Sequence, residues 1–185
     1  MKLTAKKRVG ETKGATKQAR RDGSIPAVFY SPGKPGQSIE IDTAQFEAAL
    51  RSIKQGYLST TVFSLDLDEK KTKALVKDVQ YDRTTYRVIH LDFMELVDDT
   101  PVTVLVPIEC VGQEECAGIK LGGFLRQVIR KVKVKCAPKD IPTDFKLDIR
   151  DLKMRQSKRL SDLAMPKGVK PMTVADEVVA VIAKR

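Results

Sequence analysis

The sequence predicts a mainly β protein with short helices, divided into two small β-rich domains. Apolar and polar residues alternate over short segments such as Ser59–Leu67 and Pro101–Val111, and this alternation is typical of strands with one buried face. Turn-forming clusters of Gly, Pro and Asp separate these segments. A length of 185 residues allows two small domains. We place the boundary at Glu95–Thr100, which gives domains over residues 1–95 and 96–185.

The first domain is predicted to begin with a strand over Leu3–Val9, followed by a basic helix that starts near Lys13. Gly23 is the stop signal of that helix. Its further strands are expected at Ile25–Tyr30, Ser38–Ile41, Ser59–Leu67, Lys73–Val79 and Val88–Phe93.

A second helix is predicted after Asp42, which resembles an N-cap with Gln45 three residues on. Apolar residues follow at helical spacing up to Ile53, and Gly56 is expected to end the helix. Several strands with two helices in the first domain predict a small closed or half-closed β-barrel.

The second domain is predicted to open with a strand whose buried face carries Val102, Val104, Val106 and Ile108. A loop is expected over Gly112–Gly123. Lys131, Lys133 and Lys135 alternate with apolar residues, which indicates a half-buried strand with a lysine face. Shorter strands are expected at Phe145–Ile149 and Val178–Ile182.

Positive charge is the main indication of function. The net charge is +10, and residues 1–35 hold nine Lys and Arg against two Asp and Glu. On a helix, Lys13, Lys17 and Arg20 share one face, while two alanines, Ala15 and Ala19, share the other. Like charges at this spacing repel each other, so the helix makes sense if a polyanion neutralises the face. Nucleic acid is the polyanion that this pattern favours.

The sequence offers little for catalysis or for cofactor binding. It has one histidine, His90, and no Walker or dinucleotide-binding fingerprint. Three cysteines without a C-x-x-C pair argue against a metal site and a disulfide framework, and buried free thiols are expected. No segment resembles a secretory signal or a membrane span. We therefore expect a soluble, cytoplasmic protein that has no cofactor, metal, membrane partner or small-molecule substrate.

RNA binding requires cations for phosphates, planar groups for stacking, and amides or carboxylates for base edges and ribose hydroxyls. A carboxylate on an RNA-facing surface is repelled by phosphate, and is tolerated where it accepts a hydrogen bond from a base. His90 and Asp92 are two residues apart on a predicted strand, so they can share a face. The candidate RNA-binding residues are Arg8, Lys13, Lys17, Arg20, Arg21, Tyr30, Gln80, Arg83, His90 and Asp92.

At these residues the sequence resembles a known family, the bacterial large-subunit ribosomal proteins that bind 5S ribosomal RNA, in the two-domain form also called the general stress protein CTC family. The resemblance spans nearly the whole chain. The matching segments are Lys13-Gly14-Ala15 leading to Ala19-Arg20-Arg21, Ile25-Pro26-Ala27-Val28-Phe29-Tyr30, Lys77-Asp78-Val79-Gln80-Tyr81-Asp82, His90-Leu91-Asp92-Phe93, Val106-Pro107, Gly122-Gly123 and Ile141-Pro142.

The resemblance implies a six- or seven-stranded barrel similar to the anticodon-binding domain of glutaminyl-tRNA synthetase, docked on an internal loop of 5S ribosomal RNA. It implies that Tyr30, Gln80, His90 and Asp92 face the minor groove, with the loop Tyr81–Tyr86 beside them. It also implies that the basic residues hold phosphates and sugars: Arg8, Lys13, Lys17, Arg20 and Arg21.

The expected role is a structural, non-enzymatic one in the large ribosomal subunit, where the protein would stabilise the central protuberance. Its partners would be 5S ribosomal RNA and neighbouring ribosomal components. Two alternatives remain open at this point, namely a translation-linked stress protein with mainly protein partners and a tRNA-recognition module. An independent enzyme is the least favoured class.

Overall fold

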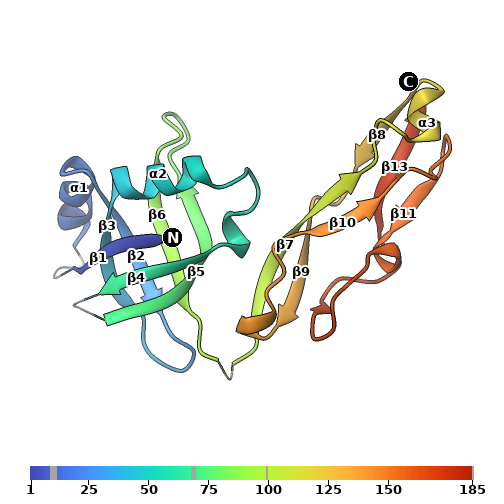
Figure 1. The fold of residues 1–185 in the computed structure, drawn as a ribbon. Helices are drawn as coiled ribbons and strands as arrows, with labels where there is room; N and C mark the ends of the chain where they lie inside the picture. Colours follow the sequence, from blue (N-terminus) through green and yellow to red (C-terminus); the bar gives the residue numbers. More distant parts are fainter. Residues whose placement is uncertain (9–11, 68–69, 99, 185) are drawn as a thin grey trace. The chain divides into compact units, whose positions relative to one another are not determined.

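The computed structural model describes residues 1–8, 12–67, 70–98 and 100–184. The chain forms two compact units, Met1–Thr100 and Pro101–Arg185, each rich in strands (Figure 1). The prediction of a mainly β protein with short helices is confirmed.

The first unit is a closed barrel with strand order β1-β3-β2-β6-β5-β4. Of the two predicted forms, closed and half-closed, the closed form is therefore present. β1 pairs with β4, and β2 with β6, in parallel, whereas the other pairs are antiparallel. Val9 of the predicted first strand lies outside the described residues. The strands are β1 Lys2–Lys7, β2 Ser24–Tyr30, β3 Gln37–Asp42, β4 Val62–Leu67, β5 Lys70–Tyr81 and β6 Val88–Glu95.

The predicted helices are α1, Lys13–Arg21, and α2, Thr43–Ser52. Asp42 caps α2 as expected, because its side chain accepts a hydrogen bond from the Gln45 backbone N–H. Gln45 does not complete a capping box. Its Oε1 accepts a hydrogen bond from the Thr4 backbone N–H and so ties the helix to β1.

Two predicted boundaries are wrong. Helix α2 ends at Ser52, ahead of Gly56, because Ile53 is already extended and packs against the barrel core. The strand expected from Ser59 begins only at Val62, because residues Leu58–Thr60 form a 3-10 turn, η1. Thr60 and Thr61 stabilise this turn by donating their hydroxyl hydrogens to the Tyr57 carbonyl.

The barrel core is built on three phenylalanines from different elements. The Phe63 ring centroid lies 6.4 Å from that of Phe46 and 6.2 Å from that of Phe93, the latter edge to face. All three side chains are fully buried. The aromatic contacts add to the apolar burial, so α2, β4 and β6 are held together at one point.

The second unit contains two sheets, with orders β10-β7-β9-β12 and β11-β13-β8. The predicted strands and the burial of Val102, Val104, Val106 and Ile108 are confirmed. All three cysteines are free. The elements are β7 Val102–Val111, α3 Ala117–Lys120, β8 Gly123–Gln127, β9 Lys131–Cys136, η2 Pro138–Asp140, β10 Phe145–Asp148, β11 Ser157–Arg159, η3 Leu160–Asp162, β12 Lys170–Pro171 and β13 Val178–Lys184.

The segment Gly112–Gly123 is not simply a loop, because it contains α3 and leads directly into the unpredicted strand β8. Gly123 begins β8 where the chain packs tightly. A Cβ there would lie 2.7 Å from both the Gly118 carbonyl oxygen and the Ile182 side chain. Gly123 thus permits close backbone packing, whereas Gly122 before it adopts a positive φ of 89° in open space.

We expect Phe63→Ala to destabilise the first unit by about 3–5 kcal/mol, because it removes the ring shared by both aromatic contacts and leaves a cavity. All four tyrosines lie in this unit and the chain has no tryptophan, so urea unfolding followed by tyrosine fluorescence reports on this unit alone. Val62→Ala, on the outer face of the same strand, is the control and should cost less than about 1 kcal/mol. Equal losses for the two variants would contradict the assigned core.

Candidate nucleic-acid interface

Three neighbouring strands bring polar side chains together on the outside of the barrel. In register, Asp92 on β6 lies between Val28 on β2 and Asp78 on β5. Gln80 lies opposite His90. We call this surface the outer barrel face and define it by Val28, Tyr30, Asp78, Gln80, His90 and Asp92.

A β-bulge in β5 sets which residues reach this face. The register with β6 shifts between Val76 and Asp78, which adds one residue to β5 at that point. Val76 pairs with buried Phe93, whereas Asp78 pairs with outward-facing Asp92. Without the extra residue, strand alternation would turn Gln80 toward the core.

His90 and Asp92 form the centre of the outer barrel face. His90 Nδ1 lies 3.0 Å from Asp92 Oδ1, and the side chains are 24% and 35% exposed. Nδ1 is itself buried and makes no well-directed hydrogen bond to any described residue. The pair therefore retains unused hydrogen-bonding capacity beside accessible surface.

Tyr30 extends the face along β2. Partial burial, together with the negative charge of Asp92, raises the pKa of the Tyr30 phenol above its usual value of 10.0. Both causes favour the neutral form, so Tyr30 keeps its O–H donor at neutral pH and above. The Asp92 carboxylate thus lies close enough to the Tyr30 phenol to affect its ionisation.

Helix α1 presents the basic residues beside this face. Thr12 caps the helix through its side chain, Ala19 on the opposite side is buried, and Gly23 adopts a positive φ of 79° just after the helix. Lys13, Lys17 and Arg21 are exposed and form no ion pair with any described residue. Of the predicted charged face, Lys13 and Lys17 are exposed, whereas Arg20 turns to the barrel; of the small-residue face, Ala19 is buried and Ala15 half-buried.

Two arginines attach this helix to the barrel. Arg20 Nε and Nη2 both donate to the Ile89 carbonyl oxygen, at 3.1 and 2.9 Å, one residue before His90. Arg8, after β1, donates from Nη1 to Thr16 Oγ1 at 2.9 Å, while its Nε is buried without a partner among the described residues. These contacts fix α1 relative to the outer barrel face.

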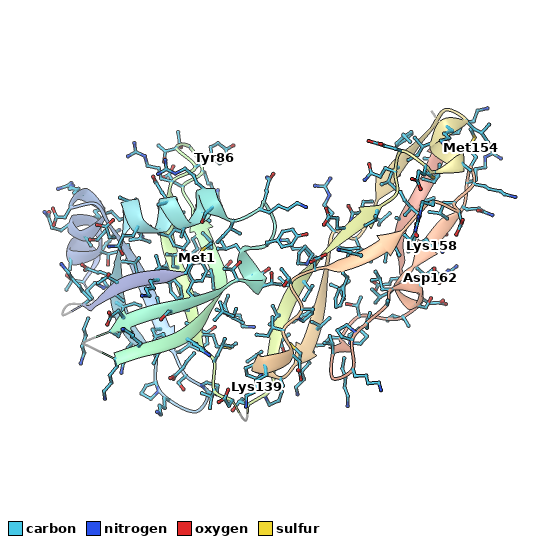
Figure 2. All side chains as sticks on the ribbon, viewed as in Figure 1. Met1, Tyr86, Lys139, Met154, Lys158 and Asp162 are labelled. Carbon is cyan, nitrogen blue, oxygen red and sulfur yellow. The ribbon has the colours of Figure 1, made fainter. Side chains whose placement is uncertain are left out.

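The hairpin loop between β5 and β6 borders the face beside Gln80 and His90. The Asp82 carboxylate accepts hydrogen bonds from the Thr84 and Thr85 backbone N–H groups, and these bonds lower the pKa of Asp82. Tyr86 has a φ of 55° and is 79% exposed. Figure 2 shows Tyr86 at the end of this hairpin, and Arg83 lies exposed in the same loop.

The structure gathers the candidate residues around one surface. Tyr30, Gln80, His90 and Asp92 share the outer barrel face, and the cations lie on α1, after β1 and in the hairpin loop. Sequence reasoning did not single out Asp78, and it named Tyr86 only as the end of the loop Tyr81–Tyr86. Strand alternation back from Gln80 could have indicated Asp78, but no residue pattern signals the positive φ of Tyr86.

Neither a metal centre nor a membrane span is found in the described parts of the chain. No group of three or more His, Cys, Asp or Glu residues is placed there to hold a metal ion. None of the helices described is both long and apolar enough to cross a membrane.

Each of the two units matches a known protein family. Residues 3–93 match the model of the ribosomal L25p family, and residues 101–185 match that of the ribosomal protein TL5 C-terminal domain. The chain is 45% identical over 185 residues to the large ribosomal subunit protein bL25 of Chlamydia abortus, and 46% identical to that of Chlamydia pneumoniae. Each alignment covers 100% of both chains.

These matches define a structural, non-enzymatic protein of the bacterial large ribosomal subunit, which is bound to the ribosome in the cytoplasm. The chain belongs to the ribosomal L25p (bL25) family, in the form that carries a TL5-type C-terminal domain.

We expect Asp92→Asn to lower the pKa of Tyr30 without returning it fully to 10.0, because burial, the larger cause, remains. Tyrosine ring-carbon NMR over a pH series measures this, with Tyr30→Phe used to assign the signal. Asp66→Asn, on β4, serves as the control and should leave the titration unchanged. A Tyr30 pKa that does not respond to the loss of Asp92 would contradict the packing of this face.

Proposed function

We propose that the first unit binds an internal loop of 5S ribosomal RNA and helps to stabilise the central protuberance of the large subunit. The observation that carries this proposal is the arrangement of Tyr30, Gln80, His90 and Asp92 on one outer face beside the basic helix α1. Membership of a large-subunit ribosomal family supports an RNA partner.

The charge of the outer barrel face favours base and ribose edges over phosphates. Asp78 and Asp92 lie directly opposite each other, so the centre of the face repels phosphate groups. Carboxylates accept hydrogen bonds from base amino and imino groups, and Tyr30 and Gln80 add donors. Regular A-form RNA does not expose its bases in the deep, narrow major groove, so a distorted internal loop with a reshaped minor groove suits this surface.

The surrounding cations supply a second, less selective contribution. Lys13, Lys17 and Arg21 point from α1 into solvent, where they can neutralise phosphates on either side of the loop. Arg20 differs from them, because its contact with the Ile89 carbonyl holds the helix beside His90. Arg20 thus links the phosphate-binding helix to the face that selects the RNA.

We expect Asp92→Ala and His90→Ala each to reduce discrimination for the loop by about 1–3 kcal/mol, roughly 5- to 150-fold, with little change in binding to generic RNA. Arg20→Ala should weaken binding to both, since it loses a cation and the position of α1. Filter binding of the full chain to a 5S loop fragment and to a random duplex measures both affinities.

Lys34→Ala, which removes an exposed cation from the loop between β2 and β3, is the matched control and should leave discrimination unchanged. If all three variants lost affinity equally for both RNAs, the outer barrel face would have no role in selection. Unchanged loop binding in the Asp92 and His90 variants would instead favour mainly protein partners.

A further inference from the structure

The second unit carries a large net positive charge. It contains seventeen Lys and Arg against ten Asp and Glu, which is seven of the ten net charges. Residues 117–139 alone hold seven cations and no acid. The proposed barrel site uses none of these residues, so this charge requires a separate explanation.

Four of these cations lie on one face of one sheet. Lys131, Lys133 and Lys135 alternate on β9 with buried Val132, Val134 and Cys136, so the three lysines point outward together. On the edge strand β12, Lys170 lies directly opposite Lys135. All four are exposed, and we call them the lysine face.

The residues directly opposite the β9 lysines on the described part of β7 include no carboxylate. The register partners of its β9 lysines on β7 are Thr103, Leu105 and Pro107. The four lysines form no ion pair with any described residue. Acids of this unit pair elsewhere, for example Asp148 with Arg150 at 2.6 Å.

This arrangement of lysines destabilises the sheet. Like charges placed directly across a strand pair, as Lys135 and Lys170 are, destabilise it. Lysines two residues apart on one face are also close, about 6.6 Å along the strand. An uncompensated row of this kind fits a ligand that brings regularly spaced negative charge to an exposed, extended surface.

We propose that the lysine face is a second RNA-binding surface, which contacts the phosphate backbone of an RNA helix without reading its sequence. Lysine ammonium groups act as point charges for phosphates, and the lysine face has no aromatic side chain on which a base could stack. The full chain thus has two RNA contacts of different kinds, a selective one on the barrel and a nonselective one on this sheet.

The test compares the full chain with the triple variant Lys131→Gln, Lys133→Gln, Lys135→Gln. Its matched control replaces three exposed lysines outside this sheet, Lys153→Gln, Lys167→Gln, Lys184→Gln, and so changes the net charge equally. Binding to a random RNA duplex is measured over a series of salt concentrations. Circular dichroism and thermal unfolding establish that each variant is folded.

We expect the lysine-face variant to bind the duplex about ten-fold more weakly at low salt, with a log–log salt slope smaller by about 2–3. The control should change little, and the melting temperature of the lysine-face variant should not fall. Equal losses in the two variants would overturn the proposal, because net charge alone would then explain binding. Unchanged duplex binding would also overturn it, and loss of binding to anionic lipid vesicles or an acidic peptide instead would identify another partner.

Discussion

Closure of the barrel is the constraint on which the rest of the first unit depends. Phe46, Phe63 and Phe93 fill the interior of the barrel. Strand alternation therefore fixes which residues face the core and which face outward. The bulge between Val76 and Asp78 then reverses the alternation for the end of β5. The same bulge keeps Val79 against the core and turns Asp78 and Gln80 outward, so it specifies both the packing and the proposed RNA-binding face.

In the proposed RNA-binding site, the groups that would select an RNA and the charges that would attract it lie in different places. The centre of the outer barrel face combines two carboxylates, a histidine and a neutral tyrosine, whereas positive charge lies around it on α1 and in the hairpin loop. Cations draw RNA from a distance and lose strength with salt, whereas short hydrogen bonds to bases persist. Under our proposal, the second unit supplies only long-range attraction, through the row of exposed lysines on β9.

The sequence predicted those features that follow from alternation and capping. These include the β4 and β6 faces, the Asp42 cap and the lysine strand β9. It could not predict β11 and β12, which are three and two residues long, because their pairing depends on distant strands. The bulge in β5 was missed for the same reason, and with it the position of Asp78. The anchoring of Arg20 on Ile89 joins residues 69 positions apart, so no local pattern indicates it.

The most direct test of this account measures the ratio of two affinities, for 5S ribosomal RNA and for an RNA of the same length without the internal loop, across a salt series with the full chain. Both affinities should fall as salt rises, because both RNAs share the phosphate contacts. The ratio should stay well above one and nearly constant, since it arises from hydrogen bonds at the outer barrel face. A ratio near one at every salt concentration would contradict the account and leave only a basic surface.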